Sequence, residues 1–221
     1  MTAAPLSSPQ PRTEHRFPVF VAAVIALVLF AVLPSEVQFL PNWLVPSIAG
    51  VVLIPLIAIN PRRLNNETRW SRWIGIGFAL GLTAINQVYV VLLVIELVSG
   101  QARGPIVLLT ALCVWITNII AFSLVYWELD RGGPVARRVE GLNDNARQDF
   151  RFPQQDNPVG VEGWQTAYPD YAYLSMTNMM AFSPTDAMPL TIRAKGLMAY
   201  QAFTGFVLLA LVISRAVNIL T

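Results

Sequence analysis

Long apolar runs, separated by short polar segments, dominate the chain. A helix that crosses a membrane needs about 20 mostly apolar residues, within a range of about 17 to 25. Five stretches meet this requirement: Phe17 to Leu33, Trp43 to Ile59, Trp73 to Val98, Pro105 to Trp127 and Gly196 to Leu220. Several tryptophans stand at or beside their ends, where indole rings settle at the level of lipid headgroups. The pattern predicts an all-α, polytopic membrane helix bundle in contact with membrane lipid.

The polar segments divide the chain into four regions. Residues 1–16 are rich in proline and polar residues and are expected to form a disordered tail. We expect the first apolar stretch to be retained as a span, because it is longer than a signal-peptide core of about 7–15 residues. Residues 17–127 form the predicted four-span bundle, 128–169 a polar cytoplasmic loop, and 170–221 a hairpin followed by the last span.

Composition and charge support this picture and predict an orientation. Only 13% of the residues are charged, compared with about 25% in soluble domains. If the N-terminus is cytoplasmic, all of the 15 Lys and Arg residues except Arg103 and Arg215 fall on the cytoplasmic side. Basic residues concentrate on that side of multi-pass proteins. We therefore expect the N-terminus and the long loop to be cytoplasmic.

The segment from Asp170 to Leu190 has two interpretations, a re-entrant hairpin or a sixth span. A lipid-facing span would bury Asp186 and break at Pro184, whereas irregular backbone survives at membrane depth only beside protein or a water-filled cavity. We therefore expect a helix from about Tyr171 to Phe182 and an irregular return to the same side. The predicted fold is five spans plus a re-entrant helix and turn before the last span.

The run from Tyr173 to Pro189 resembles the pore helix and filter of two-span potassium channels. Asp186 and Pro189 fall without a gap on the Asp and Pro of that pattern. Ser183 and Thr185 occupy the positions of the two filter glycines, which supply backbone angles that other residues resist. We therefore expect no potassium-type filter. The predicted cytoplasmic entry is also opposite to that of potassium channels.

Nearly the whole chain is similar to a family of uncharacterised bacterial polytopic membrane proteins. The motifs that carry this likeness are Tyr126 to Pro134, Phe152-Pro153-Gln154 and Ala181 to Asp186. This resemblance implies a multi-pass protein of the bacterial cytoplasmic (inner) membrane and implies no particular activity.

Two functional hypotheses follow. The first is a channel-like homo-oligomeric pore that attracts a cation through polar oxygens and a ring of carboxylates. Its candidate ion pathway consists of Thr177, Asn178, Ser183, Thr185 and Asp186. The alternative for Ser183 and Asp186 is a simple turn in which the Asp side chain bonds nearby backbone N–H groups.

The second hypothesis is a membrane scaffold or accessory subunit without transport activity. Arg137 and Arg138 in the polar loop would then contact a partner protein. Neither hypothesis involves nucleic acid.

Enzyme chemistry has little support in the sequence. The single histidine, His15, lies in the predicted tail, and the single cysteine, Cys113, lies in a span. No metal-ligand spacing, cofactor motif or nucleophile–base pair is visible. We expect Glu128 and Asp130 to pair with Arg131 or to cap the helix end.

Four polar residues near the middle of the third and fourth spans predict an interhelical clamp. They are Asn86, Gln87, Thr117 and Asn118. Antiparallel neighbours would bring them to one depth, where an interhelical hydrogen bond contributes about 0.6 kcal/mol.

Overall fold

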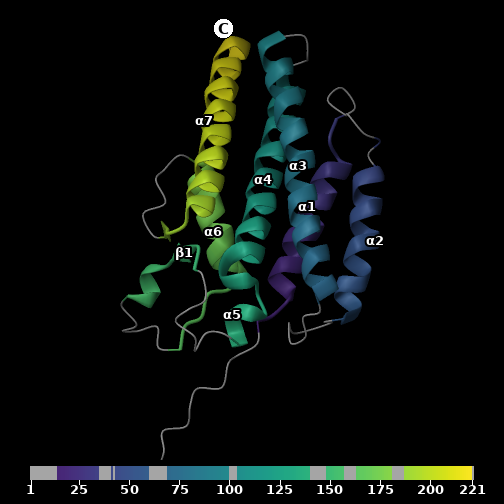
Figure 1. Ribbon diagram of the computed structural model, residues 1–221. Coiled ribbons are helices and arrows are strands. Elements are labelled where there is room, and N and C mark those ends of the chain that lie inside the picture. Colours follow the sequence, from purple (N-terminus) through teal and green to yellow (C-terminus); the bar gives the residue numbers. More distant parts are fainter. Residues whose placement is uncertain are drawn as a thin grey trace, which may run out of the picture.

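The computed structural model is an α-helical bundle with one two-stranded ribbon at its end (Figure 1). It describes residues 14–34, 41, 43–59, 69–99, 104–139, 148–156, 163–180 and 187–220. The long helices are α1 (Phe17–Ala31), α2 (Leu44–Ile59), α3 (Arg69–Ser99), α4 (Gly104–Leu129) and α7 (Ile192–Leu220). The shorter elements are α5 (Ala136–Val139), α6 (Tyr168–Met179), β1 (Phe150–Arg151) and β2 (Met188–Pro189).

Each apolar run of the sequence forms one helix. Within the described residues, three helical stretches are long and apolar enough to cross a membrane: Trp70–Ser99, Pro105–Gly132 and Ile192–Val217. The helices α1 and α2 are apolar but shorter. The last helix begins at Ile192 rather than at the predicted Gly196, so its first turns include Arg193 and Lys195.

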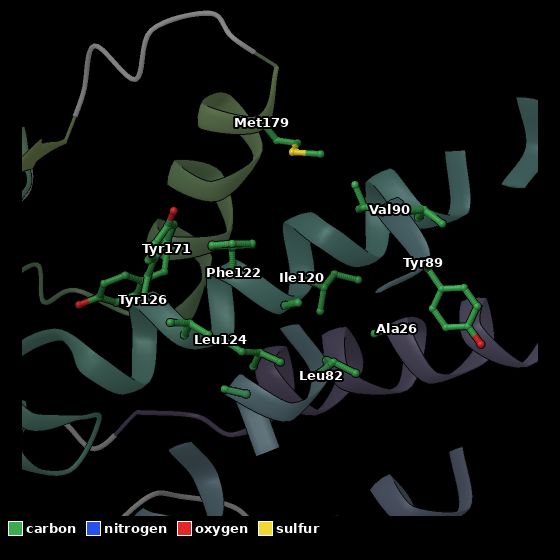
Figure 2. Close-up of a cluster of buried hydrophobic side chains, with 14 of the residues drawn as sticks. Ala26, Leu82, Tyr89, Val90, Ile120, Phe122, Leu124, Tyr126, Tyr171 and Met179 are labelled. Atoms are coloured by element: carbon green, nitrogen blue, oxygen red, sulfur yellow. The ribbon is translucent and has the colours of Figure 1, made fainter. Parts of the chain in front are cut away.

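The helix α4 is the centre of the bundle. It packs against α1, α3, α6 and α7, and every residue from Ala121 to Trp127 is buried. Figure 2 shows Phe122 and Leu124 on α4 between the tyrosine Tyr171 of α6 and the residues Ala26 and Leu82 of α1 and α3. A helical stretch that is buried on all sides needs side chains without charge around its whole circumference, and none of the residues from Ala121 to Trp127 is charged.

The helix α6 enters the bundle from the end where α4 stops. Its 12 residues give a length of about 18 Å at about 1.5 Å per residue, about 60% of the hydrocarbon thickness of a membrane. Figure 1 shows α6 beside the part of α7 nearest β1 and α5. The helix begins at Tyr168 rather than Tyr171, because Pro169 suits the first turn and Asp170 accepts a hydrogen bond from the backbone N–H of Ala167 at 2.7 Å.

The chain that follows α6 returns to the end of the bundle where α6 began. Met188 of β2 pairs with Arg151 of β1 in antiparallel register, and the backbone N–H of Leu190 donates to the carbonyl oxygen of Asp149 at 2.8 Å. This ribbon lies beside the C-terminal end of α4, because the backbone N–H of Asp149 donates to Asp130 at 2.8 Å. The predicted turn residues Ser183, Pro184, Thr185 and Asp186 lie outside the described residues.

The C-terminal end of α6 contacts α7 at a glycine. A methyl group added to Gly205 would overlap the backbone carbonyl oxygen of Met179, the last residue of α6. The absence of a side chain at Gly205 therefore sets how closely α6 and α7 approach.

We expect Gly205→Ala to destabilise the bundle by about 1–3 kcal/mol, because overpacking forces backbone shifts. Gly77→Ala is the matched control: it is also inside a helix, but an added Cβ would meet no atom within 4 Å. Helix propensity favours alanine in both variants by about 1 kcal/mol, so the difference isolates the clash. Thermal unfolding in detergent measures it, and equal stability of the two variants would contradict the close contact.

Candidate functional site

The exposed face of α6 borders a cleft of about 370 Å³, here called the α6 cleft. The cleft follows α6 from its first turn at Pro169 to its third turn at Thr177. Its opposite wall comes from the loop before α6 and from the returning chain. The lining residues are Phe152, Pro153, Gln154, Pro169, Asp170, Tyr173, Leu174, Thr177 and Ala187.

The two described residues of the predicted ion pathway lie on different faces of α6. Thr177 lines the α6 cleft, and its hydroxyl donates to the carbonyl oxygen of Tyr173 at 3.0 Å. Asn178 is buried instead, and its amide nitrogen donates to the carbonyl oxygen of Met198 on α7 at 2.9 Å. The structure therefore places Thr177 at an accessible surface and uses the amide of Asn178 for helix packing.

A hydrogen-bonded centre around Gln201 joins α6 to α4 and α7. The side chain of Gln201 is fully buried, and its oxygen accepts hydrogen bonds from Tyr126 at 2.7 Å and from Asn178 at 2.9 Å. Its nitrogen donates to the hydroxyl of Ser175 at 2.7 Å. That hydroxyl in turn donates to the carbonyl oxygen of Ile119 at 2.7 Å. Neutral amides and hydroxyls thus hold the C-terminal half of α6, at Ser175 and Asn178, against α4 and α7.

A second polar contact joins α3 and α4 at three of the four residues that predicted a clamp. The amide nitrogen of Asn86 donates to Thr117 at 2.7 Å, and Asn118 donates to the amide oxygen of Asn86 at 2.8 Å. The structure does not place Gln87 in this contact. Its oxygen accepts a hydrogen bond from Tyr200 of α7 at 3.1 Å.

A buried ionic group, here called the basal cluster, consists of Glu14, Trp127, Asp130, Arg137 and Tyr171. Arg137 is only 6% exposed, and its guanidinium lies 3.7 Å from the carboxylate of Glu14. It also donates to the carbonyl oxygen of Trp127 at 2.5 Å and lies over the rings of Trp127 and Tyr171, at 5.9 and 5.0 Å from their centroids. The same carboxylate of Glu14 accepts hydrogen bonds from Trp127 at 2.9 Å and from the backbone N–H of Tyr168 at 2.7 Å.

Asp130 is the second carboxylate of the basal cluster, and it does not bond as the sequence predicts. Instead of pairing with Arg131, it accepts a hydrogen bond from the hydroxyl of Tyr171 at 2.5 Å and two from the backbone of β1 and its flank. Burial raises the pKa of Tyr171 well above its ordinary value; nearby Arg137 lowers it, and Asp130 raises it. The Tyr171 hydroxyl therefore keeps its proton at neutral pH and remains a donor to Asp130.

The sequence reasoning missed much of the basal cluster. It placed Glu14 in the disordered tail, although this residue is 4% exposed and bonded to the start of α6. It also assigned Phe150 and Phe152 to a polar loop, although both are buried against Tyr171. The available signal was the aromatic Phe152-Pro153 pair inside an otherwise polar loop.

Metal ligation was considered for the part of the chain that the structure describes. Within it, no group of three or more His, Cys, Asp or Glu side chains is placed to hold a metal ion. Comparison with protein-family models, curated proteins and solved structures finds no match to this chain.

Removing the buried guanidinium should destabilise the protein strongly. We expect Arg137→Met to cost about 3–5 kcal/mol, because it leaves the carboxylate of Glu14 buried without its counter-charge. The control is Arg151→Met, which breaks the exposed ion pair with Asp156 and should cost about 0–1 kcal/mol. Unfolding of both variants in detergent measures this, and similar losses in the two would refute the importance of the basal cluster.

Proposed function

We propose that the chain is an integral membrane protein in which several copies form a channel-like pore for cations, without a potassium-type filter. The observation that carries this proposal is the path of α6. The length of this helix is about 60% of the hydrocarbon thickness of a membrane, and β2, which follows it, lies at the end of the bundle where α6 begins.

The outer surface of the long helices suits a lipid environment. Large apolar side chains such as Phe203 and Phe206 on α7 and Val91 on α3 are more than half exposed. A patch of this kind on a protein surface marks contact with lipid or with other protein. The charged basal cluster lies at the opposite end of α7 from its C-terminus, which fits a cytoplasmic location of that end in a bacterial cytoplasmic membrane.

The direction of α6 favours a cation near its C-terminal end. The C-terminal end of a helix carries a partial negative charge from its unpaired carbonyl groups, and in α6 this end lies at Met179, beside the middle of α7. The sequence continues into the predicted turn with the carboxylate of Asp186. The helix dipole and the carboxylate would both attract a cation.

The exposed face of α6 favours a wet surface shared by several copies. It carries Tyr173 and Thr177, whose hydroxyl groups are poorly matched to lipid tails. The opposite face is committed to the contacts of Asn178 and Gln201 within one chain. A pathway along α6 would therefore run outside the single bundle, and a homo-oligomer would enclose it.

The scaffold alternative receives less support from the geometry. Its main feature was the pair Arg137 and Arg138 in the loop. Arg137 is buried and bonded within its own chain, so its side chain is not presented to a partner protein.

The proposed re-entrant path predicts that residues before and after α6 are labelled from the same side of the membrane. In a Cys113→Ala background, single cysteines at Arg151 and Met188 should react with an impermeant maleimide applied from the cytoplasmic side, and a cysteine at Val217 only from the other side. The double variant Arg151→Cys/Met188→Cys should also form a disulfide, since the two residues are paired in the ribbon. Labelling of Arg151→Cys and Met188→Cys from opposite sides would establish a sixth span instead.

The proposed pore predicts cation flux in proteoliposomes. We expect Thr177→Val to reduce the flux about tenfold, which corresponds to about 1.4 kcal/mol in the barrier. Asp186→Asn should lower the preference for cations over anions. The control is Thr83→Val, because the hydroxyl of Thr83 likewise bonds to its own helix but lies on α3. Absence of flux in the wild type, or equal flux in the two threonine variants, would overturn the proposal.

A further inference from the structure

We infer that the α6 cleft binds a small organic cation, specifically a primary ammonium ion that carries an apolar substituent. This inference rests on the proposed function, because Thr177 belongs both to the cleft and to the proposed pathway. It adds a ligand class and a location that the pore proposal does not require.

The size of the cleft points to a small molecule. Its volume of about 370 Å³ falls at the lower end of the range of about 300–1,000 Å³ that is typical of small-molecule sites. A bare monovalent metal ion would leave most of this space unfilled. An amine with one ring or a short alkyl chain fits its dimensions.

The polar groups of the cleft present hydrogen-bond acceptors. Asp170 supplies a carboxylate, and the described lining residues include no lysine, arginine or histidine. The hydroxyl of Thr177 donates its proton to the carbonyl oxygen of Tyr173, which leaves its lone pairs as acceptors. The side-chain oxygen of Gln154 is buried with no donor among the described residues. A ligand that complements this set carries a positive charge and N–H donors.

The apolar groups of the cleft match the remainder of such a ligand. Phe152 and Tyr173 contribute aromatic rings, and Pro153 and Pro169 contribute flat apolar surface. A cation near an aromatic face is attracted by the negative charge of the ring surface. An anionic ligand would be repelled by the carboxylate and by the negative faces of the rings.

The rigidity of the wall supports a preformed site. The ring of Phe152 contacts those of Tyr171 and Trp164, with centroid distances of 5.5 and 6.0 Å. Asp170 is held by its hydrogen bond from the backbone N–H of Ala167. Tyr173, by contrast, is 51% exposed, so its replacement should disturb the fold little.

The test uses the full-length protein in phosphatidylglycerol nanodiscs, with benzylammonium chloride as the probe and benzyl alcohol as its neutral analogue. Calorimetry should detect saturable binding of benzylammonium and none of benzyl alcohol. The fluorescence of Trp164, which contacts Phe152, should change with binding, and Trp164→Phe should remove this signal.

Two variants and their matched controls locate the site. Asp170→Asn and Tyr173→Leu should each weaken binding about tenfold, in keeping with the loss of a charge partner or a cation–π contact. The controls Asp156→Asn and Tyr200→Leu lie outside the cleft and should bind as the wild type does; Tyr200 is 51% exposed, like Tyr173. Equal binding of benzylammonium and benzyl alcohol, or unchanged affinity in both cleft variants, would overturn the inference.

The same measurements distinguish a lipid headgroup from a free amine as the ligand, and they test the binding site separately from the pore. Weaker apparent affinity in nanodiscs that contain phosphatidylethanolamine would identify a lipid ammonium headgroup as a competing occupant of the site, and unchanged affinity would identify a free amine. Binding requires no conduction. Flux without binding would therefore overturn this inference alone, and binding without flux would overturn the pore alone.

Discussion

The carboxylate of Asp130, at the C-terminal end of α4, bonds both to the first turn of α6 and to the ribbon through which the chain returns after α6. One oxygen accepts a hydrogen bond from the hydroxyl of Tyr171 on α6, and the other accepts hydrogen bonds from the backbone N–H groups of Asp149 and Phe150. Those residues lead into the ribbon with β2, from which the chain enters α7. A single buried carboxylate with three donors thus fixes the positions in space of the first turn of α6 and of the ribbon that follows it. Charge-assisted hydrogen bonds of this kind are stronger than neutral ones, which suits a junction of four segments.

The distribution of charge follows from the cost of desolvation. Ionised groups gather at the end of the bundle, where Glu14 meets Arg137 and Asp149 pairs with Arg193. The polar contacts farther inside are neutral and involve amides and hydroxyls such as those of Asn86 and Gln201. A charge buried in an apolar interior is costly unless it is paired, whereas a hydrogen-bonded amide is tolerated. The bundle therefore uses ions to fix its end and amides to align its helices.

The helix α6 has two faces with different environments, and its proposed role depends on this asymmetry. Its inner face is bound through Ser175 and Asn178 to α4 and α7. Its outer face borders a cleft whose described lining carries acceptors and aromatic rings and no basic side chain. Because the inner face is fixed, the position of Thr177 and Tyr173 at the cleft is fixed too. That rigidity is what a binding or conducting surface requires.

The sequence by itself determined the helices and the depth of their polar residues. The apolar runs predict the five long helices to within a few residues, because burial or lipid contact demands continuous apolar surface. The spacing of Asn86 and Thr117 predicts their common depth for the same reason. Only the tertiary structure decided which partners meet: Glu14 with Arg137, Asp130 with Tyr171, and Asn178 with Gln201 rather than with the cleft. These contacts join residues far apart in the chain, and no local periodicity encodes them. The packing of α1, α4, α6 and α7 brings them together, and with them the cleft beside α6.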